Sequence, residues 1–194
     1  QASVPPALFG SDVHGKTLGI VGMGNIGAAI ARRGRLGFNM PILYSGNSRK
    51  TAVEQELGAQ FRSLDQLLAE ADFVCLVVPL SEKTRHLISR RELGLMKKSA
   101  ILVNISRGPV VDEPALIEAL QNGTIRGAGL DVYEKEPLAE SPLFALKNAV
   151  TLPHIGSATH ETREAMANRA LDNLRSALLG ERPQDLVNPQ VFKG

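Results

Sequence analysis

The chain has 194 residues, of which 43% are hydrophobic, and its formal net charge is +2. This composition is sufficient for a buried core, and because the charges are interspersed, without a basic tract or an aromatic platform, nucleic-acid binding is not expected. The longest apolar run, Phe73–Leu80, is too short to cross a bilayer and the sequence does not open with a signal-like segment, so we expect no membrane partner.

The chain opens with a segment that lacks periodicity and contains two adjacent prolines. Residues 1–15 are therefore predicted to form an extended arm or hinge that leads into a first strand. That strand is Leu18–Val21, a short apolar run typical of buried parallel strands. It ends in Gly22, and together with Gly24 and Gly27 this glycine completes the pattern GxGxxG.

The three glycines suit a dinucleotide-binding turn between this strand and a helix that begins at Asn25. Gly22 permits a tight turn, Gly24 lets a pyrophosphate approach the backbone, and Gly27 lets the helix pack against the strand. The first amides of the helix would then face the phosphates. The alternative is an ordinary strand-turn-helix corner.

Met40–Tyr44 is the second predicted strand, about 20 residues after the glycine motif, where such folds select between NAD and NADP. The acidic residue typical of NAD sites is missing there. The segment that follows offers hydroxyl, amide and cationic groups that suit a ribose 2′-phosphate, from Ser45, Asn47, Ser48, Arg49 and Lys50. We expect NADP as the cofactor, with NADPH preferred and NAD possible; the alternative is a solvated loop without a binding role.

The middle of the chain alternates between helical and strand patterns. Helices are expected over 51–58 and 63–70, and a short third strand over 59–62. The apolar run 73–78 predicts a central strand that ends near Pro79, a candidate for cofactor contact at the ligand crevice, although an ordinary strand end is the alternative. Cys75, the only cysteine, lies in this strand and cannot form an internal disulfide, which favours a reducing cytoplasm.

A helix over 89–96 and a strand over 100–105 follow, and this strand leads to Ile105 and Arg107. A further strand over 128–132 places Asp131 at its end, and a short strand over 150–152 precedes His154 and Gly156. Because carboxyl ends of parallel strands share one edge, these residues are expected at the crevice. The alternation of strands and helices predicts an α/β fold, a doubly wound, mostly parallel sheet of the Rossmann type.

Three residues near these strand ends suit the reduction of a ketone by hydride transfer. A cation must hold the substrate carboxylate, an acid must protonate the carbonyl oxygen, and a carboxylate must orient that acid and keep it protonated. Arg107, His154 and Glu136 fit these three roles. No metal site is expected.

The sequence resembles the D-isomer-specific 2-hydroxyacid dehydrogenases, and within them the bacterial glyoxylate/hydroxypyruvate reductases, also called 2-ketogluconate reductases. The resemblance extends over nearly the whole chain and is carried by LGIVGMGNIG (18–27), GFNMPILY (37–44), DFVCLVVPL (72–80), NISRGPVVD (104–112), GLDVYEKEP (129–137) and PHIGSATHETR (153–163).

The resemblance implies specific roles for several residues. Arg107, Glu136 and His154 would form the catalytic set, and Asp131 and His154 would lie near the nicotinamide. Gly24, Asn25 and Ile26 would lie at the pyrophosphate, and the segment 47–50 would lie at the 2′-phosphate. It also implies a homodimer formed through nucleotide-binding domains and a small 2-oxo or 2-hydroxy acid as substrate.

Members of this family begin with a flavodoxin-like substrate domain, whereas this sequence starts at the hinge into the nucleotide-binding domain. The expected organisation is therefore an arm (1–15), a dinucleotide-binding domain (16–160), and a helix and tail (161–194) that belong to the otherwise missing substrate domain. We expect the chain alone to be an inactive portion of the enzyme.

Alternative functions remain within and beyond the enzymes. Another dehydrogenase of the same superfamily, acting on phosphoglycerate or phosphite, would share these motifs. A non-catalytic, dinucleotide-sensing interaction module of the corepressor type shares the fold and keeps similar residues. Only turnover separates these functions from the first.

Overall fold

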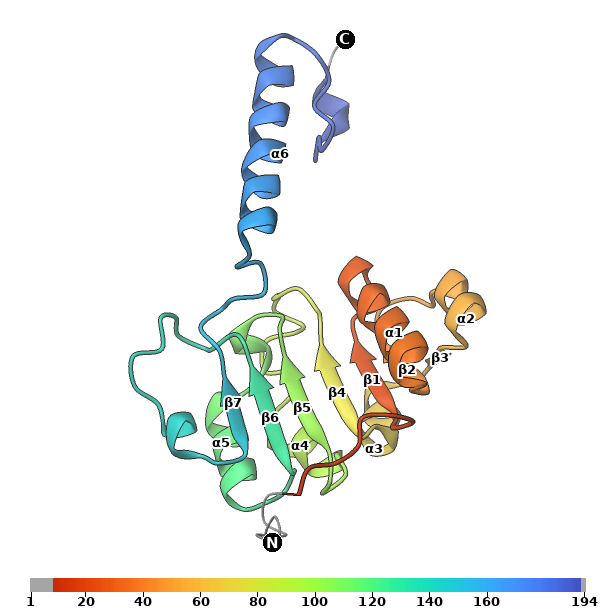
Figure 1. Cartoon of the computed structure of the whole chain (residues 1–194), viewed down its shortest axis with the longest axis vertical. Coiled ribbons are helices and arrows are strands. Elements are labelled where there is room, and N and C mark those ends of the chain that lie inside the picture. Colours follow the sequence, from red (N-terminus) through yellow and green to blue (C-terminus); the bar gives the residue numbers. More distant parts are fainter. Residues whose placement is uncertain (1–8, 193–194) are drawn as a thin grey trace, which may run out of the picture. The chain divides into compact units, whose positions relative to one another are not determined.

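A computed structural model describes residues 9–192 of the chain (Figure 1). The chain divides into two compact units, one that ends at His154 and one that begins at Ile155. Within the described residues, the first unit contains a seven-stranded sheet with the strand order β3-β2-β1-β4-β5-β6-β7. All neighbouring strands run parallel, which confirms the predicted doubly wound α/β fold.

The strands of the sheet are β1 (Leu18–Val21), β2 (Ile42–Ser45), β3 (Gln60–Phe61), β4 (Phe73–Leu76), β5 (Ile101–Asn104), β6 (Gly127–Leu130) and β7 (Ala149–Thr151). The helices of the same unit are α1 (Asn25–Phe38), α2 (Thr51–Leu57), α3 (Leu64–Glu70), α4 (Arg90–Leu95) and α5 (Glu113–Gln121). β1 and β4 lie side by side although the chain runs outward from β1 before it returns to β4. This pair is the topological switch point, where open parallel sheets bind ligands.

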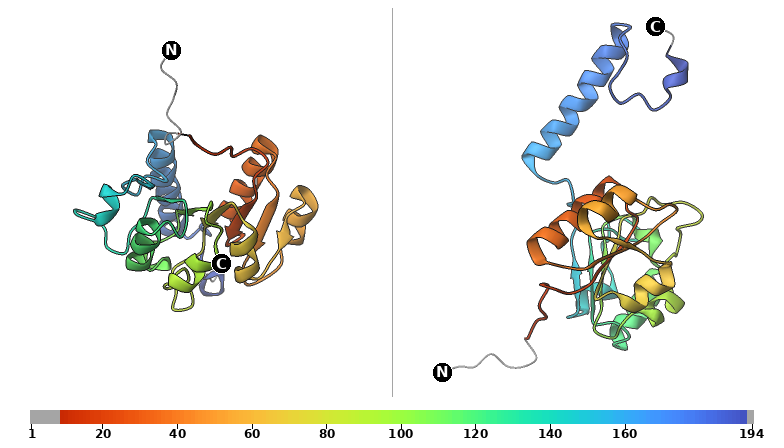
Figure 2. Two further views of the ribbon diagram at one scale, coloured as in Figure 1. Left: turned by 90° about the horizontal axis from the view of Figure 1, so that it is seen from below. Right: turned by 90° about the vertical axis from the view of Figure 1, so that its right-hand side faces the viewer.

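Helices cover both faces of the sheet (Figure 2). Because successive strand residues point to opposite faces, Ile20 and Val21 belong to different buried clusters. The cluster with residues of α1 and α2 includes Ile20, Ala31, Tyr44 and Leu57. The larger cluster, with residues of α3, α4 and α5, includes Leu68, Leu76, Leu93 and Leu116.

Helix termini follow the capping residues of the sequence. Ser63 accepts a hydrogen bond from the Gln66 amide and forms a capping box at the start of α3. Asp112 caps α5 through the Ala115 amide, and Pro114 lies in the first turn. Asn39 ends α1 in the left-handed region with φ of 50°.

The observed strands differ from the predicted ones mainly at their ends. β2 begins at Ile42 rather than Met40, because the chain first turns through Asn39. β4 ends at Leu76, so Val77 and Val78 lie beyond the regular strand; the Val77 amide still donates to the Val21 carbonyl at 2.8 Å. β3 has two residues instead of four, which is common for an edge strand with one neighbour.

Cys75 lies in the centre of β4, the strand in which it was expected, and is buried. Burial raises the pKa of its thiol to about 11. None of the helices within residues 9–192 is both long enough and apolar enough to span a membrane.

The second unit contains α6 (His160–Leu178), followed by a returning tail. Thr159 caps this helix by accepting from the Thr162 amide. Arg169 pairs with Asp185, with 2.7 Å between Nη2 and Oδ1, and Asn173 also contacts that carboxylate at 2.7 Å. The helix buries none of its side chains. The assignment of residues 161–194 to the substrate domain of a longer protein remains a prediction.

Candidate functional site

The glycine turn after β1 is shaped by close backbone contacts. Gly22 has φ of 103°, and a Cβ on it would lie 2.6 Å from the carbonyl oxygen of Val77. A Cβ on Gly27 would lie 2.3 Å from the carbonyl oxygen of Gly22. These two positions therefore require glycine for the fold itself.

Gly24 differs, because a Cβ there would meet no atom within 4 Å. Gly24, Asn25 and Ile26 are exposed, with Ile26 62% accessible. Helix α1 begins here without a side-chain cap and without an acidic residue in its first turn. An uncapped helix start beside an open glycine leaves backbone amides free for an anion, so these residues fit the pyrophosphate of a dinucleotide.

The loop predicted to bind a 2′-phosphate follows β2. Ser45 is the last residue of that strand, and Asn47, Ser48, Arg49 and Lys50 are exposed. Arg49 forms a bidentate contact with Glu54 of α2, at 3.1 Å from Nε to Oε1 and 2.8 Å from Nη2 to Oε2. Sequence reasoning missed Glu54, because its contact with the loop depends on how α2 folds back.

Three further predicted cofactor contacts lie on other strand-end loops. Pro79 is exposed beyond β4, and its carbonyl accepts from the Thr84 hydroxyl at 2.6 Å. Ile105, which follows β5, is 39% exposed. Asp131, which follows β6, is only 7% exposed. Because all strands are parallel, these loops leave the same edge of the sheet as the glycine turn.

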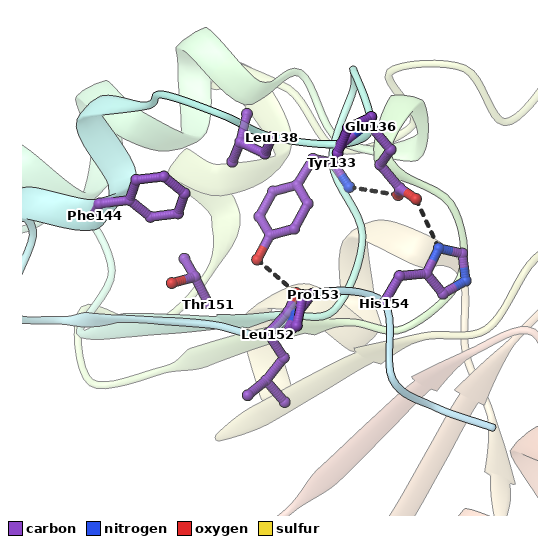
Figure 3. A pocket seen from close by; sticks show the side chains of 9 residues that line it. Tyr133, Glu136, Leu138, Phe144, Thr151, Leu152, Pro153 and His154 are labelled. Atoms are coloured by element: carbon purple, nitrogen blue, oxygen red, sulfur yellow. Dashed lines mark hydrogen bonds and ion pairs between the residues drawn. The ribbon is translucent and has the colours of Figure 1, made fainter. Parts of the chain in front are cut away.

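Glu136 and His154 come together in the structure although 18 residues separate them. His154 Nδ1 lies 2.7 Å from Glu136 Oε2 (Figure 3). Both side chains are partly accessible, at 50% for His154 and 34% for Glu136. His154 has φ of 54°, a left-handed conformation uncommon outside glycine, and such residues cluster at functional sites.

The surroundings of Glu136 favour the ionised form of its carboxyl group over the protonated form. Partial burial by itself raises its pKa, but this is outweighed by hydrogen bonds from His154 and from the Tyr133 amide and by the positive charges of His154 and Arg107. The pKa of Glu136 therefore lies below its ordinary value. A carboxylate paired in this way holds the imidazole with its Nδ1 as donor and leaves Nε2 for other chemistry.

Tyr133 connects the two loops that carry this pair. Its amide donates to Glu136 Oε1 at 3.0 Å, and its hydroxyl donates to the carbonyl of Leu152 at 2.8 Å. Tyr133 also lines a largely apolar pocket of about 460 Å³ that Glu136 and His154 border at one end and Phe144 at the other (Figure 3). Sequence reasoning missed this role, because a tyrosine beside a strand end predicts only core packing.

Arg107 lies on an ordered turn after β5. The side chain of the buried Asn104 accepts from the Ser106 amide at 3.1 Å and donates to the Arg107 carbonyl at 3.1 Å. Such local side-chain bonds fix a turn. Gly108 follows, and a Cβ on it would lie 1.7 Å from the carbonyl oxygen of Tyr133. The Arg107 turn therefore packs directly against the loop that leads to Glu136.

A second histidine and glutamate also form a contact in the first unit. The side chain of His86 is 43% exposed, and its Nε2 lies 2.5 Å from Glu134 Oε1. Gly156 follows His154 in the chain but belongs to the second unit, so its predicted cofactor contact stays a prediction.

Within residues 9–192, no cluster of histidine, cysteine and acidic side chains has the arrangement of a metal site.

The parallel sheet and the open glycine turn at its switch point define a dinucleotide-binding domain of the Rossmann type. A model of the family described as "D-isomer specific 2-hydroxyacid dehydrogenase, NAD binding domain" matches residues 2–156. The chain therefore belongs to the D-isomer-specific 2-hydroxyacid dehydrogenase family, which confirms the resemblance found in the sequence.

Proteins and solved structures that resemble the chain support this family assignment. The chain is 58% identical over 193 residues to the glyoxylate/hydroxypyruvate reductase B of Escherichia fergusonii, covering 99% of the chain and 60% of that protein. It resembles the TT0316 protein from Thermus thermophilus at 48% identity with a TM-score of 0.88, covering 96% of this chain and 58% of that one. A glyoxylate reductase from Paecilomyes thermophila is 44% identical, with a TM-score of 0.85 and coverage of 93% and 55%. The chain thus spans about 60% of the length of the curated relatives it matches.

Proposed function

We propose that this chain is the dinucleotide-binding part of an NADP-dependent reductase. Its substrate would be a small 2-oxo acid, such as glyoxylate, hydroxypyruvate or 2-ketogluconate, and its product the D-2-hydroxy acid. The observation that carries the proposal is the contact of 2.7 Å between His154 Nδ1 and Glu136 Oε2, beside the Arg107 turn. The name of the Escherichia fergusonii relative supports this substrate class.

Each side chain has a role that follows from its chemistry. Arg107 binds the substrate carboxylate, because a guanidinium offers two parallel donors to a carboxylate. His154 protonates the carbonyl oxygen from Nε2 during reduction and accepts that proton in the reverse direction. Glu136 fixes the ring through Nδ1 and favours its charged form. The bound nicotinamide cofactor supplies the hydride.

The preference for NADP rests on the segment after β2. The strand ends in Ser45 rather than an acidic residue, and Arg49 and Lys50 are exposed nearby. A guanidinium and an ammonium group attract a 2′-phosphate, whereas a carboxylate at the strand end would repel it. NADPH is therefore the expected cofactor, with NADH a weaker one.

Three further features belong to the same proposal. The protein forms a homodimer through its nucleotide-binding domain, which sedimentation velocity tests directly. It acts in the cytoplasm, in agreement with its single, buried cysteine. The chain alone binds cofactor but does not turn over substrate, because family members complete the active site with a second domain.

Calorimetric titration of the chain with NADPH and NADH tests the cofactor assignment. Tighter binding of NADPH is the expected result, and tighter binding of NADH would overturn the preference. The cofactor fragments 2′-AMP and 5′-AMP, which lack the nicotinamide, serve as a matched pair, because they differ in the position of the phosphate that the loop after β2 is proposed to bind.

Turnover is tested after fusion of the chain to the part of the Escherichia fergusonii relative that it does not cover. Oxidation of NADPH with glyoxylate or hydroxypyruvate supports the reductase. Turnover confined to phosphoglycerate or phosphite would favour the other dehydrogenases. Cofactor binding without any turnover in this fusion would favour a dinucleotide-sensing module of the corepressor type.

A further inference from the structure

The side chain proposed to recognise the 2′-phosphate already has an anionic partner. Arg49 directs Nε and Nη2 at the two oxygens of Glu54, at 3.1 Å and 2.8 Å. Nε and Nη2 form one of the two edges with which a guanidinium binds a phosphate or carboxylate through two parallel hydrogen bonds, and the other edge shares Nη2. A 2′-phosphate bound through either edge therefore competes with Glu54 for Nη2.

Glu54 is held firmly in this position. The hydroxyl of the buried Tyr44 donates to Glu54 Oε1 at 2.6 Å and accepts from the Lys50 amide at 2.6 Å. The Tyr44 ring packs edge-on against Phe61, with 5.3 Å between ring centroids. Because Tyr44 belongs to the core, it fixes both Glu54 and the end of the loop.

Glu54 also keeps its negative charge. Hydrogen bonds from Arg49 and from Tyr44 lower the pKa of its carboxyl group below the ordinary value. Its side chain is 16% exposed, whereas that of Arg49 is 67% exposed. The arginine can therefore move toward a ligand more easily than the glutamate can move away.

We propose that Glu54 is a specificity-determining residue that weakens binding of the 2′-phosphate by occupying Arg49, and so limits the selectivity for NADP over NAD. This inference rests on the proposed role of Arg49 at the 2′-phosphate. Removal of the Glu54 charge frees the guanidinium edge and removes a repelling anion from the loop. NAD lacks the 2′-phosphate and gains nothing from either change.

The test compares Glu54→Gln with Glu56→Gln in calorimetric titrations of the chain with NADP⁺ and NAD⁺. Glutamine keeps an oxygen for the Tyr44 hydroxyl. Glu56 is a matched control, because it lies on the same helix and forms its own bidentate pair, with Arg32 at 2.8 Å, while the charge change is identical. Circular dichroism and thermal unfolding confirm that both variants fold.

We expect Glu54→Gln to raise the affinity for NADP⁺ about three- to tenfold and to leave that for NAD⁺ within about twofold. Glu56→Gln should change both affinities by less than about twofold. On an Arg49→Ala background, Glu54→Gln should keep only the smaller effect of removing a repelling anion, because the contact with Arg49 is then absent. An unchanged or lowered affinity of Glu54→Gln for NADP⁺ overturns the inference.

The same experiment distinguishes a wrong role of Arg49 from a wrong role of Glu54. If Arg49→Ala alone leaves NADP⁺ affinity unchanged, Arg49 does not bind the 2′-phosphate, and the cofactor assignment above is wrong. If Arg49→Ala weakens NADP⁺ binding while Glu54→Gln does not strengthen it, the assignment stands and only the competition by Glu54 is refuted.

Discussion

Gly108 and Tyr133 approach each other so closely that a single methyl group cannot fit between them. A Cβ on Gly108 would lie 1.7 Å from the carbonyl oxygen of Tyr133 and 2.4 Å from the amide nitrogen of Glu134. Both neighbours are backbone atoms, so rotation of a side chain cannot relieve the overlap. This contact joins the Arg107 turn to the loop that carries Glu136.

Gly108→Ala should therefore damage both the fold and the site. We expect the free energy of unfolding to fall by about 3 kcal/mol, because the two loops must separate to accommodate the methyl group. Urea unfolding followed by circular dichroism measures this loss. Gly37→Ala is the control: Gly37 lies in α1 with nothing within 4 Å of its Cβ position, and alanine there should stabilise by about 0.5 kcal/mol. Equal stability of the two variants would contradict the close contact.

Gly24→Ala should separate binding from folding. A Cβ at Gly24 meets open space, so the free energy of unfolding should stay within about 0.5 kcal/mol of that of the unmodified chain. The methyl group would instead occupy the space proposed for the pyrophosphate, and dinucleotide affinity should fall about tenfold or more. Calorimetry with NADPH measures the loss, and Gly37→Ala again serves as the control that retains affinity. Full dinucleotide affinity in the Gly24→Ala variant would show that the pyrophosphate does not bind at this turn.

Glu136→Gln should impair turnover far more than it impairs substrate binding. An amide facing His154 Nδ1 no longer favours the charged ring, so kcat in the completed enzyme should fall about 10²-fold or more. Steady-state kinetics with saturating NADPH separates kcat from KM. Glu134→Gln is the matched control, because it removes the charge from the neighbouring contact of 2.5 Å with His86, which has no proposed part in proton transfer. Similar losses in both variants would indicate a structural role of the loop instead.

Asp72 provides a prediction for the pH dependence of stability. It accepts from the Thr17 amide at 2.9 Å and pairs with Lys97 at 2.8 Å. Burial opposes its ionisation, but these partners outweigh burial, so its pKa lies below the ordinary value of 3.8. The carboxylate therefore contributes stability above the unfolded-state pKa, and this contribution is lost as the pH falls through the lower folded-state pKa.

Asp72→Asn should lower the free energy of unfolding by about 1–2 kcal/mol at pH 7, and the difference from the unmodified chain should shrink below about pH 4. Urea unfolding at a series of pH values measures both effects. Asp12→Asn, at an exposed position, should change stability by less than about 0.5 kcal/mol at each pH. A difference that does not depend on pH would exclude the charge of Asp72 as its cause.

The parts of the site that depend on local sequence were predictable. GxGxxG predicted the turn after β1, and two of its reasons are local: Gly22 has a φ of 103°, and a Cβ on Gly27 would meet the Gly22 carbonyl oxygen. The contact of Gly22 with Val77 comes from a distant part of the chain. The fold class followed from the alternation of apolar strands and helical patterns. The pairing of Glu136 with His154 was predicted from the chemistry that the two residue types can perform together.

Contacts between distant elements were not predictable in the same way. From the sequence alone, Glu54 is an ordinary helix residue; its contact with Arg49 depends on how α2 packs beside the loop. Gly108 gives no local sign that the Tyr133 carbonyl lies against it. Strand ends also shifted, as at β2 and β4, since the point where a strand stops depends on its neighbours more than on its own residues.

The buried thiol of Cys75 can report how often the centre of the sheet becomes accessible to a reagent. Cys75 belongs to β4, between β1 and β5, and packs in the buried cluster with residues of α1 and α2, so a thiol reagent reaches it readily only when the elements around it move apart. Its rate of modification in native conditions therefore measures how often the middle of the domain opens. Since the strands around Cys75 also hold the glycine turn and the Arg107 loop, a bound dinucleotide should slow this reaction, and the same single cysteine would then record ligand binding without any added label.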